Sequence, residues 1–110
     1  MTTVHEDHSH AGQGPVLLDL GGDVGALIVH TPGAIAGQEI ELCPAGAGRD
    51  ARHRRHVAVL ARQAGARELH AAVFPAVPAG RYELWVKPDG PTELSATVVG
   101  GEITEAHWPG

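Results

Sequence analysis

Histidine is the residue type in this chain whose abundance and spacing most directly suggest chemistry. The chain contains 8 histidines among 110 residues. A neutral imidazole is a good ligand for Zn, Ni or Cu, and short His-rich tracts are a common form of such sites. The sequence therefore predicts histidine ligands for any transition metal that the protein binds. The candidate ligands are His5, His8, His10, His56 and His70.

The first three candidates form a His-x-x-His-x-His pattern in the N-terminal segment. Residues 1–14 are polar, rich in histidine and end in Gly-Gln-Gly. This composition predicts a flexible tail. A solvated tail that binds no metal is the alternative interpretation, and we favour it.

His56 and His70 lie on two neighbouring predicted strands, so their relation depends on the strand register. If Val57 pairs with Ala71, both imidazoles share the outer face as diagonal neighbours, with ~7–8 Å between their α-carbons. If a four-residue turn over 63–66 joins the strands instead, His56 lies on the opposite face. Because a slip of one residue moves every side chain to the other face, register decides whether this pair exists.

Arginine is concentrated in one segment of an otherwise acidic chain. Six of the 8 basic residues lie within 49–67, whereas the formal net charge of the whole chain is −5. That net charge argues against a general nucleic-acid partner. Within the segment, Arg52, Arg54 and Arg55 disfavour a metal and favour an anion, because guanidinium forks match phosphate or carboxylate. A solubilising loop that binds no anion is the alternative interpretation, and we favour it.

Motifs for covalent catalysis are missing from the sequence. The only serines are Ser9 and Ser95, and there is no Gly-x-Ser-x-Gly, phosphate loop or His-Glu-x-x-His. Cys43 is the only cysteine, which excludes an intrachain disulfide and the usual cysteine-based zinc sites. These absences favour a non-catalytic protein.

Short segments with alternating apolar and polar residues must position these side chains. In 39–43, for example, Ile40 and Leu42 share the face expected to point inward. Turn signals rich in Gly and Pro separate the segments at the 8–12-residue spacing that indicates a sandwich or barrel. The predicted fold is all-β, a small antiparallel Greek-key β-sandwich of seven or eight strands in a single domain over 15–110. The expected strands are 16–20, 26–30, 39–43, 56–62, 67–74, 82–86, 92–99 and 102–107. Segment 33–38 has room for one helical turn, but Gly33 and Gly37 make it a poor helix.

The last third of the chain resembles a known group of domains. The sequence from Pro78 to Val86, Pro-Ala-Gly-Arg-Tyr-Glu-Leu-Trp-Val, is followed by Gly-Gly-Glu-Ile-Thr-Glu over 100–105. Together these segments resemble the closing strands of prealbumin-like and carboxypeptidase-regulatory-like domains. The resemblance implies a Greek-key β-sandwich, in families whose members are often accessory modules.

Prealbumin-like folds also include a hydrolase, hydroxyisourate hydrolase, which works with histidines and arginines. His30, Arg54, His56 and His107 have suitable chemistry, but the chain lacks that family's terminal Tyr-Arg-Gly-Ser. The resemblance therefore implies no site residues here.

Three functions follow, in order of preference. The first is a non-catalytic β-sandwich module that contacts proteins, with a homodimer through an edge strand as one form and segment 49–67 as a secondary contact. The second is a histidine-based metal-binding protein, and the third is a small prealbumin-like hydrolase. The N-terminus has no signal-peptide pattern and no apolar run is long enough to span a membrane, so we expect a cytoplasmic protein.

Overall fold

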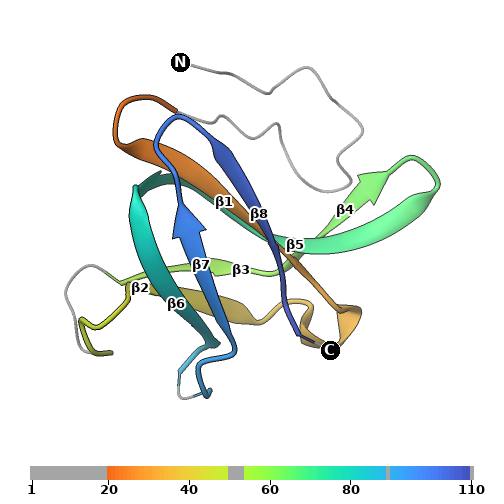
Figure 1. The fold of residues 1–110 in the computed structure, drawn as a ribbon. Helices are drawn as coiled ribbons and strands as arrows, with labels where there is room; N and C mark the ends of the chain where they lie inside the picture. Colours follow the sequence, from red (N-terminus) through yellow and green to blue (C-terminus); the bar gives the residue numbers. More distant parts are fainter. Residues whose placement is uncertain (1–19, 50–53, 89, 110) are drawn as a thin grey trace.

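The computed structural model describes residues 20–49, 54–88 and 90–109 (Figure 1). The predicted tail over 1–14 and nearly all of the predicted strand 16–20 lie outside these ranges. The described residues form eight strands and one short 3₁₀ helix. In chain order these are β1 (Val24–Thr31), η1 (Gly33–Ile35), β2 (Glu39–Pro44), β3 (Arg55–Ala58), β4 (Leu60–Ala64), β5 (Arg67–Pro78), β6 (Gly80–Val86), β7 (Leu94–Val98) and β8 (Ile103–His107).

The strands form two four-stranded sheets, with the orders β4-β5-β1-β8 and β3-β2-β6-β7. The prediction of a small all-β sandwich is therefore confirmed. One pair departs from the expected antiparallel arrangement, because β8 runs parallel to β1. Two strands joined by a hairpin are antiparallel. Strand β8 follows β7 of the other sheet and has no hairpin connection to β1, so β8 can run in the same direction as β1.

The inner faces of the two sheets enclose an aliphatic core. Ile40 and Leu42 of β2 are completely buried, as their alternation predicts, and so is Leu84 opposite Leu42 on β6. From the other sheet, Leu27 and Phe74 join the same cluster. Branched aliphatic side chains suit these positions because they pack well on a pleated surface.

The predicted strand over 56–62 is divided between the two sheets. Val59 is completely buried at the crossing point, where its N–H donates to the carbonyl of Gln38 and its carbonyl accepts from the N–H of Gly37, both at 2.8 Å. The side chain of Val59 is buried in the core and its backbone groups pair with residues 37–38. The chain therefore leaves β3 at this residue and enters β4 in the other sheet.

This crossing also changes the register. A two-residue turn closes the β4–β5 hairpin, and Leu60 pairs with Ala71. Both registers considered from the sequence, with Val57 opposite Ala71 or with a turn over 63–66, are therefore wrong. Gly65 opens the actual turn with φ +66°, as the first position of a type II′ turn requires.

Strand β5 continues four residues beyond its predicted end at Phe74. Pro75 lacks an N–H group, which disfavours it within a regular ladder. Opposite this point the pairing with β1 shifts between Gly25 and Leu27. A bulge of this kind accommodates a proline and increases the local twist, so the strand persists to Pro78.

Candidate functional site

The outer face of sheet β3-β2-β6-β7 carries a buried cluster that we call the Trp85–Glu41 platform, after its two central residues. Glu41 of β2 lies directly opposite Trp85 of β6. Both point away from the aliphatic core, yet Trp85 is 1% exposed and Glu41 is 5% exposed. Among the described residues, Glu41 is the only buried charged side chain. Side chains at outward positions become this inaccessible only when another part of the protein covers them.

Arginine side chains from the segment between β2 and β3 contact both parts of this platform. The guanidinium carbon of Arg49 lies 4.0 Å from the centroid of the Trp85 ring, a favourable cation–π arrangement. The Arg49 Nη2 group also donates to Thr92 Oγ1 at 3.3 Å. Alternation along β6 directs Trp85 away from Tyr82 and Leu84, but nothing in the sequence indicates that an arginine would lie on its ring.

The second arginine neutralises the buried carboxylate. Arg54 Nε lies 3.4 Å from Glu41 Oε2, and the two side chains are 42% and 6% exposed. Arg54 Nη1 also donates to the backbone carbonyl of Arg49. A buried carboxylate without a partner would be strongly unfavourable, so this ion pair makes the burial of Glu41 possible.

The thiol of Cys43 completes the cluster. Its Sγ donates to the carbonyl of Gly48 at 3.1 Å, and the residue is 2% exposed. Burial is the main reason that the pKa of the Cys43 thiol lies above its ordinary value. A reactive cysteine needs an accessible thiolate with a lowered pKa, so this thiol is a structural group.

One polar atom of the platform is not satisfied. The indole Nε1 of Trp85 is buried and has no hydrogen-bond partner among the described residues. Most buried donors in proteins are paired. An unpaired donor within a cluster of charged groups therefore indicates a place where a ligand acceptor would be favourable.

The metal-ligand pair predicted from the sequence does not form. His56 lies on β3, where its Nδ1 is 2.6 Å from Glu39 Oε1. His70 lies on β5 in the other sheet, with its Nε2 4.0 Å from Glu68 Oε1. The cause is the crossing at Val59, which separates the two strands that the sequence placed together. His5, His8 and His10 lie outside the described residues, so the metal prediction for them stands as a prediction.

A different histidine cluster forms where β1 meets β8. The parallel register places His30 opposite His107, and their rings stack with centroids 5.0 Å apart. His30 Nε2 is also 2.7 Å from Glu105 Oε1. Across residues 20–49, 54–88 and 90–109, however, no three His, Cys, Asp or Glu side chains are arranged to hold a metal ion. The sequence contained no signal for this cluster because it depends on a parallel pairing between distant strands.

The arginines predicted to contact an anion are already engaged where the structure describes them. Arg54 pairs with Glu41, and Arg55 Nη1 donates to the carbonyl of Ala76 at 3.1 Å. Arg52 lies outside the described residues. The four residues considered for hydrolase chemistry are also divided, because His30 and His107 belong to one sheet whereas Arg54 and His56 lie at β3 of the other.

The edge strands are the remaining candidate binding elements. Strands β4 and β8 end one sheet, and β3 and β7 end the other. Strand β7 reads Leu-Ser-Ala-Thr-Val and contains neither a charged residue nor a proline. Each of the other three edges carries at least one charged side chain, namely Arg55, Arg62 and Glu105.

Comparisons of this chain with protein-family models, with curated proteins and with solved structures found no match. Within the part of the chain that the structure describes, no helix is long and apolar enough to cross a membrane.

Proposed function

We propose that this protein is a non-catalytic β-sandwich module that acts through protein–protein contact, and that strand β7 makes this contact. The observation that carries the proposal is the uncharged edge of β7. An edge strand presents unpaired backbone N–H and C=O groups that can accept another strand, and proteins usually block such edges with charges or proline. Strand addition to an open edge is a common mode of protein recognition.

The side chains of β7 favour a second copy of the same chain as the partner. In an antiparallel pairing of two β7 strands centred on Ala96, Leu94 would lie opposite Val98 and Ser95 opposite Thr97. No like charges would meet in this register. Ser95 and Thr97 are exposed whereas Val98 is buried, so hydroxyl pairs would form on the outer face. The product would be a two-fold symmetric dimer with a continuous eight-stranded sheet.

Light scattering after size exclusion tests the dimer directly. Between about 1 μM and 1 mM protein, where weak edge pairing is measurable, the mass should rise from the 11.4 kDa of one chain to twice that value. A mass that stays at one chain throughout would refute the proposal.

Charge variants test whether β7 is the contact. In S95K/T97K each lysine would face a lysine of the second copy. Two like-charge pairs at about 0.2–1 kcal/mol each weaken the dimer roughly two- to thirtyfold. S95E/T97E should be weakened similarly, and an equimolar mixture of the two variants should recover the dimer. Both positions are exposed, so the monomer fold should persist. If the equimolar mixture does not recover the dimer, the dimer contact does not lie on β7.

A further inference from the structure

The Trp85–Glu41 platform combines the two groups that recognise a guanidinium. We infer that it is a binding site for the arginine side chain of a peptide segment from another protein, and that Arg49 and Arg54 of this chain occupy it in the present structure. The proposal does not depend on strand β7. It concerns a site on the outer face of the sheet, whereas β7 pairing uses backbone groups at its edge.

The chemistry follows from the cross-strand geometry. Residues directly opposite each other on antiparallel strands have β-carbons about 4.5–5.5 Å apart, and Glu41 and Trp85 are such a pair. A guanidinium can stack on an aromatic ring and donate to a carboxylate with the same planar group. One arginine of a partner could therefore use both halves of the platform.

The contacts within this chain show that both halves accept a guanidinium. Arg49 stacks on Trp85 at 4.0 Å, and Arg54 donates toward Glu41 with a separation of 3.4 Å. Each arginine uses only one half. The Arg54 contact through Nε is a single, long ion pair, whereas guanidinium–carboxylate recognition is strongest when two parallel N–H groups donate.

Carboxylates and cations share this face of the sheet. Glu39 and Glu41 lie at alternate positions of β2, and Glu83 lies opposite Cys43 on β6. These carboxylates share the outer face with Trp85, because alternate residues of a strand point the same way. Lys87 and His56 contact Glu39, and Arg81 lies at the alternate position to Glu83 on β6. Glu41 is therefore the carboxylate that lies directly beside Trp85.

At the Trp85 half of the platform, exchange of Arg49 for an external arginine should require little free energy, whereas at the Glu41 half the incoming guanidinium must replace Arg54 in the buried ion pair. Arg49 is exposed, and an exposed cation–π contact favours the bound side chain by only about two- to fivefold. The loss of its 3.3 Å bond to Thr92 is compensated by water. Competition from Arg49 should therefore weaken an external ligand by only a small factor.

The unpaired indole donor favours a peptide over a free guanidinium ion. Trp85 Nε1 is buried and unpartnered among the described residues. A peptide brings backbone carbonyl oxygens together with the arginine, so it can satisfy this donor as well as the carboxylate. A free guanidinium ion has no acceptor to offer.

Two-dimensional ¹H–¹⁵N NMR tests the site through the indole N–H signals. The chain has 2 tryptophans, and a Trp85→Phe variant identifies the signal of Trp85. An acetylated Gly-Arg-Gly amide, the matching Gly-Lys-Gly peptide and guanidinium chloride are titrated separately. The arginine peptide should shift the Trp85 signal at lower concentration than either of the other two. Equal potency of guanidinium chloride would refute peptide recognition.

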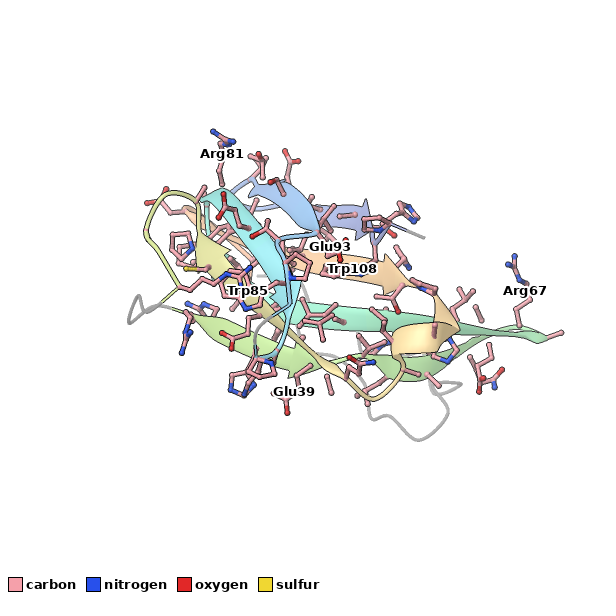
Figure 2. All side chains as sticks on the ribbon, turned by 90° about the horizontal axis from the view of Figure 1, so that it is seen from below. Glu39, Arg67, Arg81, Trp85, Glu93 and Trp108 are labelled. Atoms are coloured by element: carbon pink, nitrogen blue, oxygen red, sulfur yellow. The ribbon has the colours of Figure 1, made fainter. Side chains whose placement is uncertain are left out.

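Three variants complete the test. Arg49→Ala should bind the arginine peptide about two- to fivefold more tightly, because the internal competitor is removed. Glu41→Gln should bind it at least about tenfold more weakly, because it loses the charged acceptor. Arg81→Ala is the matched control. Arg81 lies on β6, the strand that carries Trp85, and its side chain points away from the molecule (Figure 2).

The outcomes are decisive in both directions. No shift of the Trp85 signal in either the native chain or Arg49→Ala overturns the proposal, as does unchanged binding in a folded Glu41→Gln variant. If Glu41→Gln does not give a folded spectrum, the gain in Arg49→Ala relative to Arg81→Ala remains the criterion, and its absence refutes the site.

Discussion

Sheet β3-β2-β6-β7 carries a buried pair of residues at the centre of each face, and the two pairs are built from different chemistry. On the inner face, Leu42 and Leu84 lie opposite each other and are completely buried. On the outer face, the neighbouring pair is Glu41 and Trp85, at 5% and 1% exposure. The inner pair is covered by a second sheet of apolar side chains. The outer pair is covered by arginines that contribute one cation–π contact and one ion pair.

This difference shows that burial alone does not define a core. The inner face belongs to a cluster drawn from both sheets, so it can open only when the domain unfolds. Among the described residues, the outer pair is contacted by Arg49 and Arg54 of the connecting segment. Regions with few apolar contacts open locally at lower free energy than the core. An outer cluster of this kind can exchange its cover, which is the property that ligand recognition requires.

The largest effect should follow from truncating the inner face. Leu84→Ala is expected to lower the free energy of unfolding by about 2–5 kcal/mol, because it leaves a cavity in a fully packed site. Urea denaturation followed by circular dichroism measures the change. Leu69→Ala is the matched control, since Leu69 is 37% exposed on the β4–β5 hairpin, and its cost should be about 0.5–1 kcal/mol. Equal costs at the two positions would contradict the assigned core.

An intermediate and unequal effect should follow from breaking the outer ion pair. Arg54→Ala leaves the buried Glu41 carboxylate without its described partner, at a cost of about 1–3 kcal/mol. Glu41→Gln leaves a half-exposed Arg54 that water can solvate, so its cost should be smaller. The same denaturation measurements test this order. The reverse order would show that Glu41 is less buried in solution than the structure indicates.

The smallest effect on stability should be a pH dependence at Cys43. Burial raises the pKa of this thiol above its ordinary value of 9.0. The folded protein therefore keeps its thiol proton more tightly than the unfolded chain. The contribution to stability is complete below pH 9.0 and is lost as the pH rises from there through the folded pKa. Cys43→Ala should flatten this alkaline decline.

Iodoacetamide alkylation provides an independent measurement of Cys43. The native protein should react more slowly than the urea-unfolded chain at the same pH. Arg49→Ala and Arg54→Ala should accelerate the reaction if those side chains help to cover the outer face. Native and unfolded rates that are the same would show that the thiol is accessible and would contradict the burial described here.

The sequence predicted the fold class and the approximate position of most described strands, whereas the predicted strand 56–62 is divided between the two sheets. Alternation placed Ile40, Leu42 and Leu84 inward, and the turn signals divided the chain into elements that match most of the observed strands. These features are local, because the direction of a side chain on a strand depends only on its position along that strand. The two-sheet architecture follows, since each strand has one apolar face to bury.

The candidate site was only partly predictable. The sequence indicated that Glu41 and Cys43 share a face and that segment 49–67 is basic. It did not indicate that β2 and β6 are neighbours with Glu41 opposite Trp85, or that Arg49 and Arg54 fold back over this pair. The predicted pairing of His56 with His70 failed for a related reason. A single buried residue, Val59, redirected the chain between the sheets.

The division between sequence and tertiary structure therefore follows the range of the interactions. Period-two alternation in short segments is a property of the local sequence, and it determined an aliphatic, two-layer β protein. Strand partners, the parallel entry of β8 and the meeting of His30 with His107 were decided by the assembled fold. Many pairings satisfy the same alternation, and only the packing of all strands at once selects one of them.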